Sequence, residues 1–178
     1  MNCNRWVITS GLIIGLASFG HGAYAEPTLD DATIFAIFDQ ANTTDIWIGR
    51  IGAKYGHSQE VRALGKMVAT GHEAVQQMGR DLAKKLDIVP TPPPKDTSAA
   101  DQAKAIAQLQ AKSGAEFDHA YLLHEIAFHQ SVIDSVKGVL LPAVKNSEFK
   151  ALLTKMVPGF EHHLMETKAV AAKLGVKH

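Results

Sequence analysis

The sequence predicts an all-α protein, and more specifically a four-helix bundle. Apolar residues recur every three or four positions along four long segments, which is the periodicity of one face of an α-helix. Glycine, proline, aspartate and serine separate these segments where helices commonly begin and end. No segment shows the alternation of apolar and polar residues that a half-buried strand requires. The sequence also contains no internal repeat that would favour another architecture.

The first 25 residues have the layout of a cleavable signal peptide. Arg5 supplies a positive charge, residues 6–20 are largely apolar, and Ala23-Tyr24-Ala25 forms a small-x-small cleavage site. The apolar run is shorter than the roughly 20 residues of a membrane-spanning helix, so we expect no stable membrane span after cleavage. An uncleaved anchor is the alternative. We therefore expect export to the periplasm, with cleavage after Ala25.

The remaining residues, 26–178, have the length of a single domain of about 150 residues. Cleavage removes Cys3, the only cysteine, so the exported chain has no internal disulfide and depends on its core for stability. Without Arg5, 17 basic residues stand against 18 acidic ones. This balance gives no electrostatic basis for binding nucleic acid or anionic lipid, and we expect no nucleic-acid partner.

Two helices are predicted before a proline-rich break. Asp30 or Asp31 can cap the first helix, which ends near Gly56, and Ser58 can cap the second, which continues to Leu86. Small residues in the second half of the first helix indicate close approach by a neighbouring backbone. They are Gly49, Gly52 and Gly56.

A stiff connection is predicted between the second and third long helices. Residues 90–94 read Pro-Thr-Pro-Pro-Pro, which favours an extended linker. Residues 99–112 are rich in alanine and glutamine and predict a short extra helix, which Ser113-Gly114 ends. The whole connection, residues 87–114, is long enough to run the length of the bundle and so permits a crossover.

Two further long helices follow this connection. The third is predicted to end before Pro142, because proline lacks the amide that a helix interior requires. Asn146 or Ser147 can cap the fourth, and Gly175 can end it. Pro158 lies inside the fourth helix and predicts a kink.

Titratable residues interrupt each of the four apolar stripes near its middle. With a helical rise of about 1.5 Å per residue, Asp45 lies about 18 Å before the turn at His57, and His72 about 22 Å after it. The titratable residues of the third and fourth helices lie near the midpoints of those helices. A midpoint stays at the same level whichever way a helix runs, so the titratable residues of all four helices share one level. The residues are Asp45, His72, Glu125, His129 and His163.

This shared level predicts a metal site. Isolated buried carboxylates and imidazoles cost several kcal/mol each unless they are paired or bind a ligand. A divalent metal ion would compensate them, and zinc, iron, manganese or copper suits such a set of ligands. Glu125 and His129, four residues apart, can share an ion. Asp118 lies on the same face nearly two turns earlier, where it suits a second ion, a hydrogen bond or a place at the rim.

A metal-free core is the alternative. The three histidines could be satisfied by Asp45 and Glu125 alone, in a polar network that specifies the bundle. Other histidines, namely His119, His124 and His162, fall off the inward faces and are expected to be exposed or at the rim. Tyr121 could donate to a ligand carboxylate or serve only in packing. No nucleophile elbow, phosphate-binding loop or cysteine-based zinc pattern is present, so the sequence predicts no particular reaction.

Three segments resemble a bacterial family of secreted proteins catalogued as a domain of unknown function. Residues 117–130 resemble its "FD-x-x-Y … H-E … H-Q" segment, and residues 158–164 its "P-x-aromatic-x-x-H-L" segment. Residues 67–72 resemble its "M-V-x-D-H" segment, with Gly71 in place of the acid. The resemblance covers about residues 31–174. That family is placed in the ferritin-like superfamily, and its members are often labelled outer membrane proteins.

The resemblance implies a ferritin-like four-helix bundle with a crossover between the second and third helices. It also implies that the family's recurrent polar positions correspond to His72, Asp118, His129 and His163. Asp45 stands where a glutamate is usual. Ferritin-like di-iron proteins carry Glu-x-x-His pairs, whereas this chain has Glu125-x-x-x-His129, so ferroxidase or oxygenase activity is not predicted.

Two functional hypotheses follow from the sequence. The first is a periplasmic metal-binding bundle of uncharacterised role, possible roles being metal handling or protection during stress. The second is a metal-free envelope module that interacts with a partner or acts in stress, with a polar core of histidines and carboxylates. Neither hypothesis identifies a protein partner or an oligomeric state.

Overall fold

The computed structural model describes residues 29–178, so the predicted signal peptide lies outside the described residues. Within them every regular element is helical, and the predicted all-α class is confirmed. Two long helices, α1 (Asp31–Tyr55) and α2 (Gln59–Lys85), precede the shorter α3 (Ser98–Gln110). Two more, α4 (Gly114–Ser135) and α6 (Ser147–Lys173), complete the set of long helices. None of the described helices is both long and apolar enough to cross a membrane.

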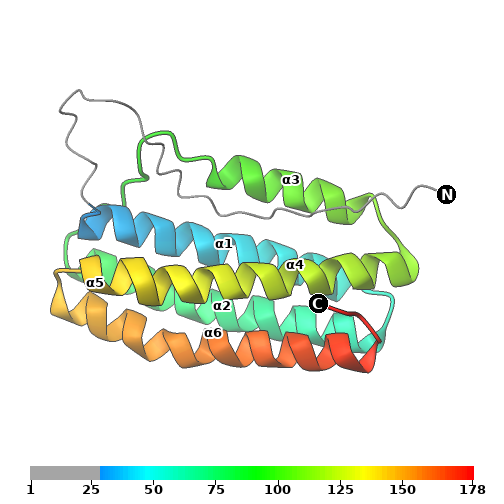
Figure 1. Cartoon of the computed structure of the whole chain (residues 1–178). Helices are drawn as coiled ribbons and strands as arrows, with labels where there is room; N and C mark the ends of the chain where they lie inside the picture. Colours follow the sequence, from blue (N-terminus) through cyan, green and yellow to red (C-terminus); the bar gives the residue numbers. More distant parts are fainter. Residues whose placement is uncertain (1–28) are drawn as a thin grey trace, which may run out of the picture.

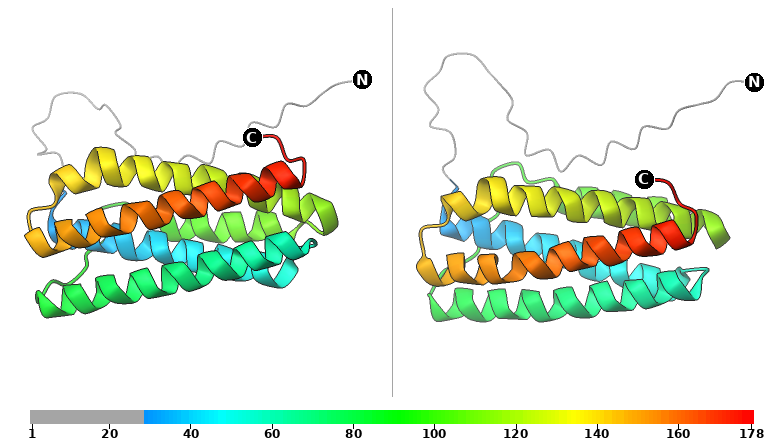
Figure 2. Two further views of the ribbon diagram at one scale, coloured as in Figure 1. Left: turned by 90° about the horizontal axis from the view of Figure 1, so that it is seen from below. Right: turned by 60° about the horizontal axis from the view of Figure 1, so that its bottom comes forward.

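The four long helices lie side by side, with α3 on the outside (Figures 1 and 2). Helix α2 packs between α1 and α6, and α4 packs along α6. Figure 1 shows that α2 and α4 run in the same direction, with α3 running the opposite way between them along the chain. Helix α3 contacts both α1 and α4, although Leu109 is its only buried residue.

Side chains cap three of the long helices as the sequence predicts. Asp30, Ser58 and Asn146 each accept a hydrogen bond from a first-turn amide, at 2.8, 3.2 and 3.0 Å. These bonds satisfy amides that the start of a helix leaves without an internal partner. Gly175 follows α6 with a φ of +70°, a conformation that favours glycine.

The α-helix α4 ends at Ser135, before Pro142, but helical turns continue past the proline, which the sequence did not predict. Helix α4 continues into a π-helical segment, η1 (Val136–Leu140), and then into the single turn α5 (Leu141–Ala143). The proline ring would displace the carbonyl one turn earlier in an ordinary helix, and the wider π turn relieves this conflict. Pro158, in contrast, lies within the continuous helix α6.

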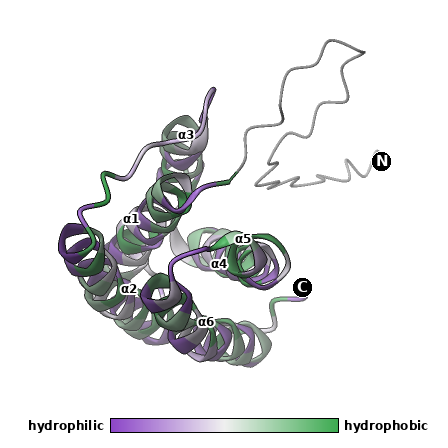
Figure 3. Cartoon of the chain, turned by 90° about the vertical axis from the view of Figure 1, so that its left-hand side faces the viewer, coloured by the Kyte–Doolittle hydropathy of each residue, from purple (hydrophilic) through white to green (hydrophobic). Residues whose placement is uncertain are grey.

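The core consists of two apolar clusters with a polar layer between them. One cluster contains Phe35, Phe38 and Phe149, and the rings of Phe35 and Phe149 stack with centroids 3.6 Å apart. The other contains Phe117 and Tyr121. Figure 3 looks along the helices and shows that hydrophobic and hydrophilic residues both occur on them. The middles of all four long helices therefore meet in the layer that separates the two clusters.

Helices α1 and α2 touch backbone to backbone. A Cβ atom on Gly49 would lie 2.8 Å from the carbonyl oxygen of Gly65, and one on Gly65 would lie 2.4 Å from the backbone nitrogen of Ala53. A Cβ on Gly52 would lie 2.5 Å from the ring of Tyr121, so this glycine makes room for the tyrosine. The close approach predicted from the glycines is confirmed.

Two buried or half-buried carboxylates join the helix pairs at opposite ends of the molecule. Asp31 on α1 accepts hydrogen bonds from the amides of residues 145 and 146, both at 2.8 Å, just before α6. Asp118 on α4 accepts from the amides of residues 57 and 58, at 2.7 and 2.8 Å, in the turn between α1 and α2. Each aspartate thus fixes a turn of the other helix pair.

Candidate metal centre

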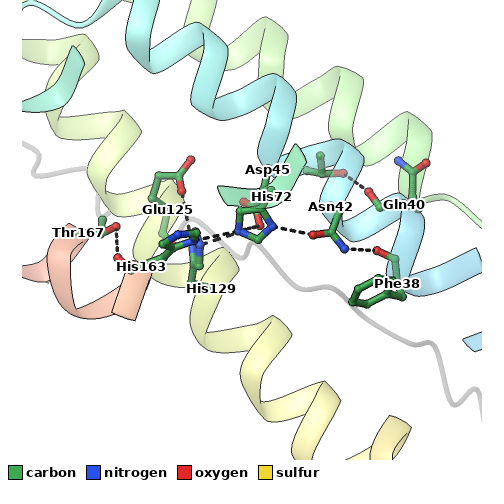
Figure 4. A network of polar contacts seen from close by, with 10 residues as sticks. Phe38, Gln40, Asn42, Asp45, His72, Glu125, His129, His163 and Thr167 are labelled. Carbon is green, nitrogen blue, oxygen red and sulfur yellow. Dashed lines mark hydrogen bonds and ion pairs between the residues drawn. The ribbon is translucent and has the colours of Figure 1, made fainter. Parts of the chain in front are cut away.

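Five of the six predicted site residues converge in the polar layer (Figure 4). Their possible ligand atoms form two overlapping groups, and within each group all the atoms lie within 4.8 Å of one another. One group is His72, His129 and His163, and the other is Asp45, Glu125 and His129. Each long helix contributes at least one of them, from a position near its middle.

The layer is dry on the side of α1, α2 and α4. Asp45, His72, Glu125 and His129 are each at most 2% exposed, whereas His163 on α6 is half-buried. Gly71 faces the ring of His163, since a Cβ there would lie 2.8 Å from its Cε1 and Nε2 atoms. His163 is therefore the one member of the cluster that solvent reaches.

His72 lies at the centre of the contacts. Its Nε2 atom is 3.1 Å from Nδ1 of His163 and 3.3 Å from Oδ2 of Asp45. The ring of Phe160 is parallel to the imidazole within 2°, with centroids 5.3 Å apart. The other nitrogen of the His72 ring, Nδ1, is 2.8 Å from Oδ1 of Asn42. His72 is thus held from three sides with Nε2 facing the cluster.

His129 is oriented by its own helix. Its Nδ1 atom donates to the backbone carbonyl of Glu125 at 3.0 Å, while Oε2 of Glu125 lies 3.3 Å from the same nitrogen. Because that hydrogen is directed at the carbonyl, neither carboxylate oxygen of Glu125 receives a hydrogen bond. The opposite nitrogen, Nε2, is 4.0 Å from Oδ2 of Asp45 and also lacks a hydrogen-bond partner.

Unpartnered buried atoms concentrate in this layer. Buried polar atoms in folded proteins nearly always have a hydrogen-bond partner, because losing solvation without one is costly. Among the described residues, the buried side-chain atoms without a partner are Asp45 Oδ2, Tyr121 Oη, His124 Nε2, both carboxylate oxygens of Glu125, and His129 Nε2. Four of the six belong to the convergent cluster. The described residues therefore offer no hydrogen-bond partner to these four atoms.

Burial and neighbouring charge shift the pKa values of these groups. Burial raises the pKa of Asp45 to about 8, with His129 opposing the shift and Glu125 adding to it. Burial lowers the pKa of His129, but the carboxylates of Asp45 and Glu125 outweigh it and raise that pKa to about 9. Burial, with the charge of His129, lowers the pKa of His72 well below its usual range and that of His163 to about 4. His72 and His163 are therefore neutral at pH 7, as metal ligands must be.

Asp118 does not join the cluster. Both of its carboxylate oxygens accept backbone hydrogen bonds at the α1–α2 turn, and the side chain is 5% exposed. Of the three roles that the sequence allows for Asp118, the structure shows the hydrogen bond. Its place on the inward face of α4 was inferred correctly, but its two-turn distance from Glu125 brings it to the end of the bundle.

The other histidines and Tyr121 divide into two groups. His119 and His162 are exposed, as expected from their helical angle. His124 is more covered than expected, because its ring lies against Phe128, with centroids 5.9 Å apart, and its Nε2 atom is buried. Tyr121 is fully buried with an unpartnered hydroxyl, and burial, with the charges of the nearby carboxylates, raises its pKa well above the usual value.

Asn42 is a member of the layer that the sequence analysis missed. It is 2% exposed, and its amide group joins Nδ1 of His72 to the backbone carbonyl of Phe38. A signal was available, since Asn42 stands three residues before Asp45 and so lies on the same face of α1.

A pocket of about 30 Å³ adjoins Asn42, Asp45 and His72 and is otherwise largely apolar, with room for one water-sized molecule.

A larger hollow of about 320 Å³ lies on the outer face of α1 and α2, away from this layer. It is open to solvent beside the half-exposed Trp47, and its two arginines already pair with Glu73 and Asp39. Its charges are thus already compensated, in contrast to those of the buried layer.

The donor set fits a divalent cation. Asp45 and His129, whose raised pKa values retain protons at pH 7, would release them on binding a cation. Two carboxylates could then balance its charge, and three imidazoles could supply nitrogen ligands. Tetrahedral zinc with ligand bonds of about 2.0–2.1 Å places neighbouring ligand atoms about 3.3 Å apart. The separations of 3.1 and 3.3 Å around Nε2 of His72 match this value, and the 4.0 Å separation at His129 needs only a small adjustment. Imidazole and carboxylate together also suit iron, manganese or copper.

Comparison with known proteins places the chain in a family. The model of the family described as "Domain of unknown function (DUF4142)" matches residues 17–170. No curated protein matches the chain, and no solved structure does. Because the matched residues make up most of the 178-residue chain, the protein belongs to this family of unknown function.

Proposed function

We propose that this protein is a periplasmic metal-binding protein that holds a divalent cation in its polar layer. The ligands are His72, His129 and His163 together with Asp45 and Glu125. The role is the handling of metal ions or protection during stress. One observation carries the proposal: unpartnered buried atoms of Asp45, Glu125 and His129 converge with the facing ring nitrogens of His72 and His163.

The count of hydrogens favours a cation over a metal-free network. The hydrogen on Nδ1 of His72 is directed at Asn42, and the hydrogen on Nδ1 of His129 is directed at a backbone carbonyl. Neutral rings therefore have no hydrogen left for either carboxylate, so without a cation a carboxyl group must hold its own proton, which agrees with the raised pKa of Asp45. Protonating Nε2 of His129 does not solve this, because 4.0 Å to Asp45 is too long for a hydrogen bond. A cation would satisfy the carboxylates and the nitrogens together.

The chain topology supports placing the protein in the ferritin-like superfamily. Parallel α2 and α4, joined through the proline-rich segment and α3, correspond to a bundle with one long crossover. The resemblance of residues 1–25 to a signal peptide supports export to the periplasm. The Glu125-x-x-x-His129 spacing separates this centre from di-iron enzymes, so metal binding is proposed without a reaction.

Metal analysis of the exported protein tests the proposal. We would produce the full chain without an affinity tag, purify the exported form, reconstitute it with each candidate metal, and measure bound metal by mass spectrometry. We expect stoichiometric metal, lost in the double variant His72→Ala plus His163→Ala. The matched control is His119→Ala plus His162→Ala, which removes two exposed histidines and should keep the metal. Substoichiometric metal in the wild type, or binding unchanged by the first pair, would count against the proposal.

A metal-free envelope module is the second candidate. The hydrogen-bonded chain from Asn42 through His72 to His163 exists without an ion and favours this reading. Thermal unfolding with and without chelator separates the two. A cation at a hundredfold excess over its dissociation constant stabilises by about 3 kcal/mol. For a domain of this size that raises Tm by roughly 6–12 °C. A melting curve that chelator leaves unchanged supports the metal-free module instead.

A further inference from the structure

The orientation of the Asn42 side chain can be read from its surroundings. One of its amide atoms lies 2.8 Å from the backbone carbonyl oxygen of Phe38. A carbonyl oxygen only accepts, so the atom facing it must be the NH₂ group. The oxygen of the same amide then faces Nδ1 of His72 at 2.8 Å. Both contacts are buried, so bulk solvent does not compete for either atom.

This orientation fixes the tautomer of His72. An amide oxygen only accepts, so Nδ1 of His72 must carry the hydrogen that joins them. In a neutral imidazole the other nitrogen then has a free lone pair. That nitrogen, Nε2, is the atom 3.1 Å from His163 and 3.3 Å from Asp45. The ring of Phe160 packs parallel to the imidazole, within 2° and with centroids 5.3 Å apart.

We propose that Asn42 is a positioning residue of the metal centre, which holds His72 as the Nδ1–H tautomer and so presents its Nε2 to the cation. This inference rests on the proposed function and extends it to a residue that does not touch the ion. The backbone carbonyl of Glu125 does the same for His129, which likewise presents Nε2. His163 differs, because its Nδ1 is the nitrogen that faces the cluster.

Helix α1 thereby supplies two functions from neighbouring positions on one face. Asp45 is a ligand, and Asn42, three residues earlier, orients the ligand of α2. Hydrogen bonds from beyond the ligands typically change metal affinity by about 10- to 100-fold. We therefore expect Asn42→Leu, which keeps the approximate size and removes both hydrogen bonds, to weaken metal binding by that factor. The protein should still fold, because leucine suits the apolar residues around this position.

Thr44→Val is the matched control for Asn42→Leu. Thr44 is a buried residue of the same helix, and its hydroxyl donates to the carbonyl of Gln40 at 3.1 Å, as the amide of Asn42 donates to Phe38. Thr44→Val thus removes a partly buried hydrogen bond from α1 and leaves the Asn42–His72 contact in place. Metal titration should show unchanged affinity for Thr44→Val and a 10- to 100-fold loss for Asn42→Leu. Equal affinity in Asn42→Leu and the wild type would overturn the inference while leaving the metal site itself intact.

Nitrogen NMR of the metal-free wild-type protein gives a second readout that needs no ion. Long-range ¹H–¹⁵N correlations distinguish the two tautomers and the imidazolium, and His72→Gln identifies the His72 signals. We expect the Nδ1–H tautomer in the wild type and in Thr44→Val, and a mixture of tautomers in Asn42→Leu. An Nε2–H tautomer or an imidazolium in the wild type contradicts the role of Asn42. If no metal binds while the Nδ1–H tautomer is observed, the proposed function fails and the hydrogen-bond assignment stands.

Discussion

Replacing Asp118 separates a structural role from a ligand role. In the structure its carboxylate accepts two backbone hydrogen bonds, at 2.7 and 2.8 Å, and the side chain is 5% exposed. Hydrogen bonds to a charged group contribute about 1.5–3 kcal/mol each. Asp118→Ala removes both and leaves two amides of the α1–α2 turn without partners, so we expect a loss of about 4 kcal/mol. At 2–4 °C per kcal/mol, Tm should fall by roughly 8–16 °C.

Urea denaturation followed by circular dichroism measures this loss, and metal analysis is run on the same samples. Asp134→Ala is the control, because Asp134 lies on α4 but is exposed, and its change should stay within about 0.5 kcal/mol. Metal content per folded molecule should remain at the wild-type value in Asp118→Ala. The reasoning is refuted if Asp118→Ala unfolds at the wild-type urea concentration, or if it loses metal while keeping its stability.

Three further predictions follow from packing, burial and protonation. Gly65→Ala places a methyl group 2.4 Å from the backbone of α1 and should destabilise by at least 1–3 kcal/mol in urea denaturation, whereas Gly159→Ala, with open space around it, should not. Tyr121→Phe removes a buried, unpartnered hydroxyl and should leave stability unchanged or raise it by about 1 kcal/mol; a clear loss would show that the hydroxyl has a partner. The pKa of His163 is lowered to about 4 from 6.5, chiefly by burial, so between these values the unfolded chain binds more protons. The contribution of His163 to the stability of the metal-free protein should therefore be lost as pH falls from about 6.5 to 4, so urea midpoints should fall by more in the wild type than in His163→Ala over this range.

Much of the fold could be predicted because its signals are local. Asp30, Ser58 and Asn146 cap the helices that their side-chain chemistry indicates, and Gly49 marks a real backbone contact. The π turn before Pro142 could not be predicted in this way. A proline signals a conflict with an ordinary helix, but only packing decides whether the helix stops or widens to continue.

The centre could be predicted as far as helical spacing reaches. Rise per residue placed Asp45, His72 and His163 at one level without knowledge of the chain direction, and the structure brings their ligand atoms together. Spacing along one helix does not give contacts between helices. Asn42 therefore went unnoticed, because a polar residue on α1 acquires its role only from the imidazole that α2 places beside it.

The covering of His124 has a similar origin. Helical angle correctly places this residue off the inward face of α4, and an exposed or rim position follows if nothing else packs there. In the structure the ring lies against Phe128, one turn along the same helix, and its Nε2 atom is buried. Contacts of this kind depend on side-chain conformation as well as on position around the helix.

The contact between Gly49 and Gly65 has a consequence for the choice among cations. Gly49 lies one turn after Asp45, and Gly65 lies two turns before His72, so the two helices meet beside both side chains. Helices in backbone contact have no intervening side chains whose rotation would let them shift. If the layer holds the proposed cation, a difference in ionic radius would then be absorbed by α4 and α6, whose glycines make no such contact. His129 and His163 would move to suit the ion, while Asp45 and His72 would keep their places.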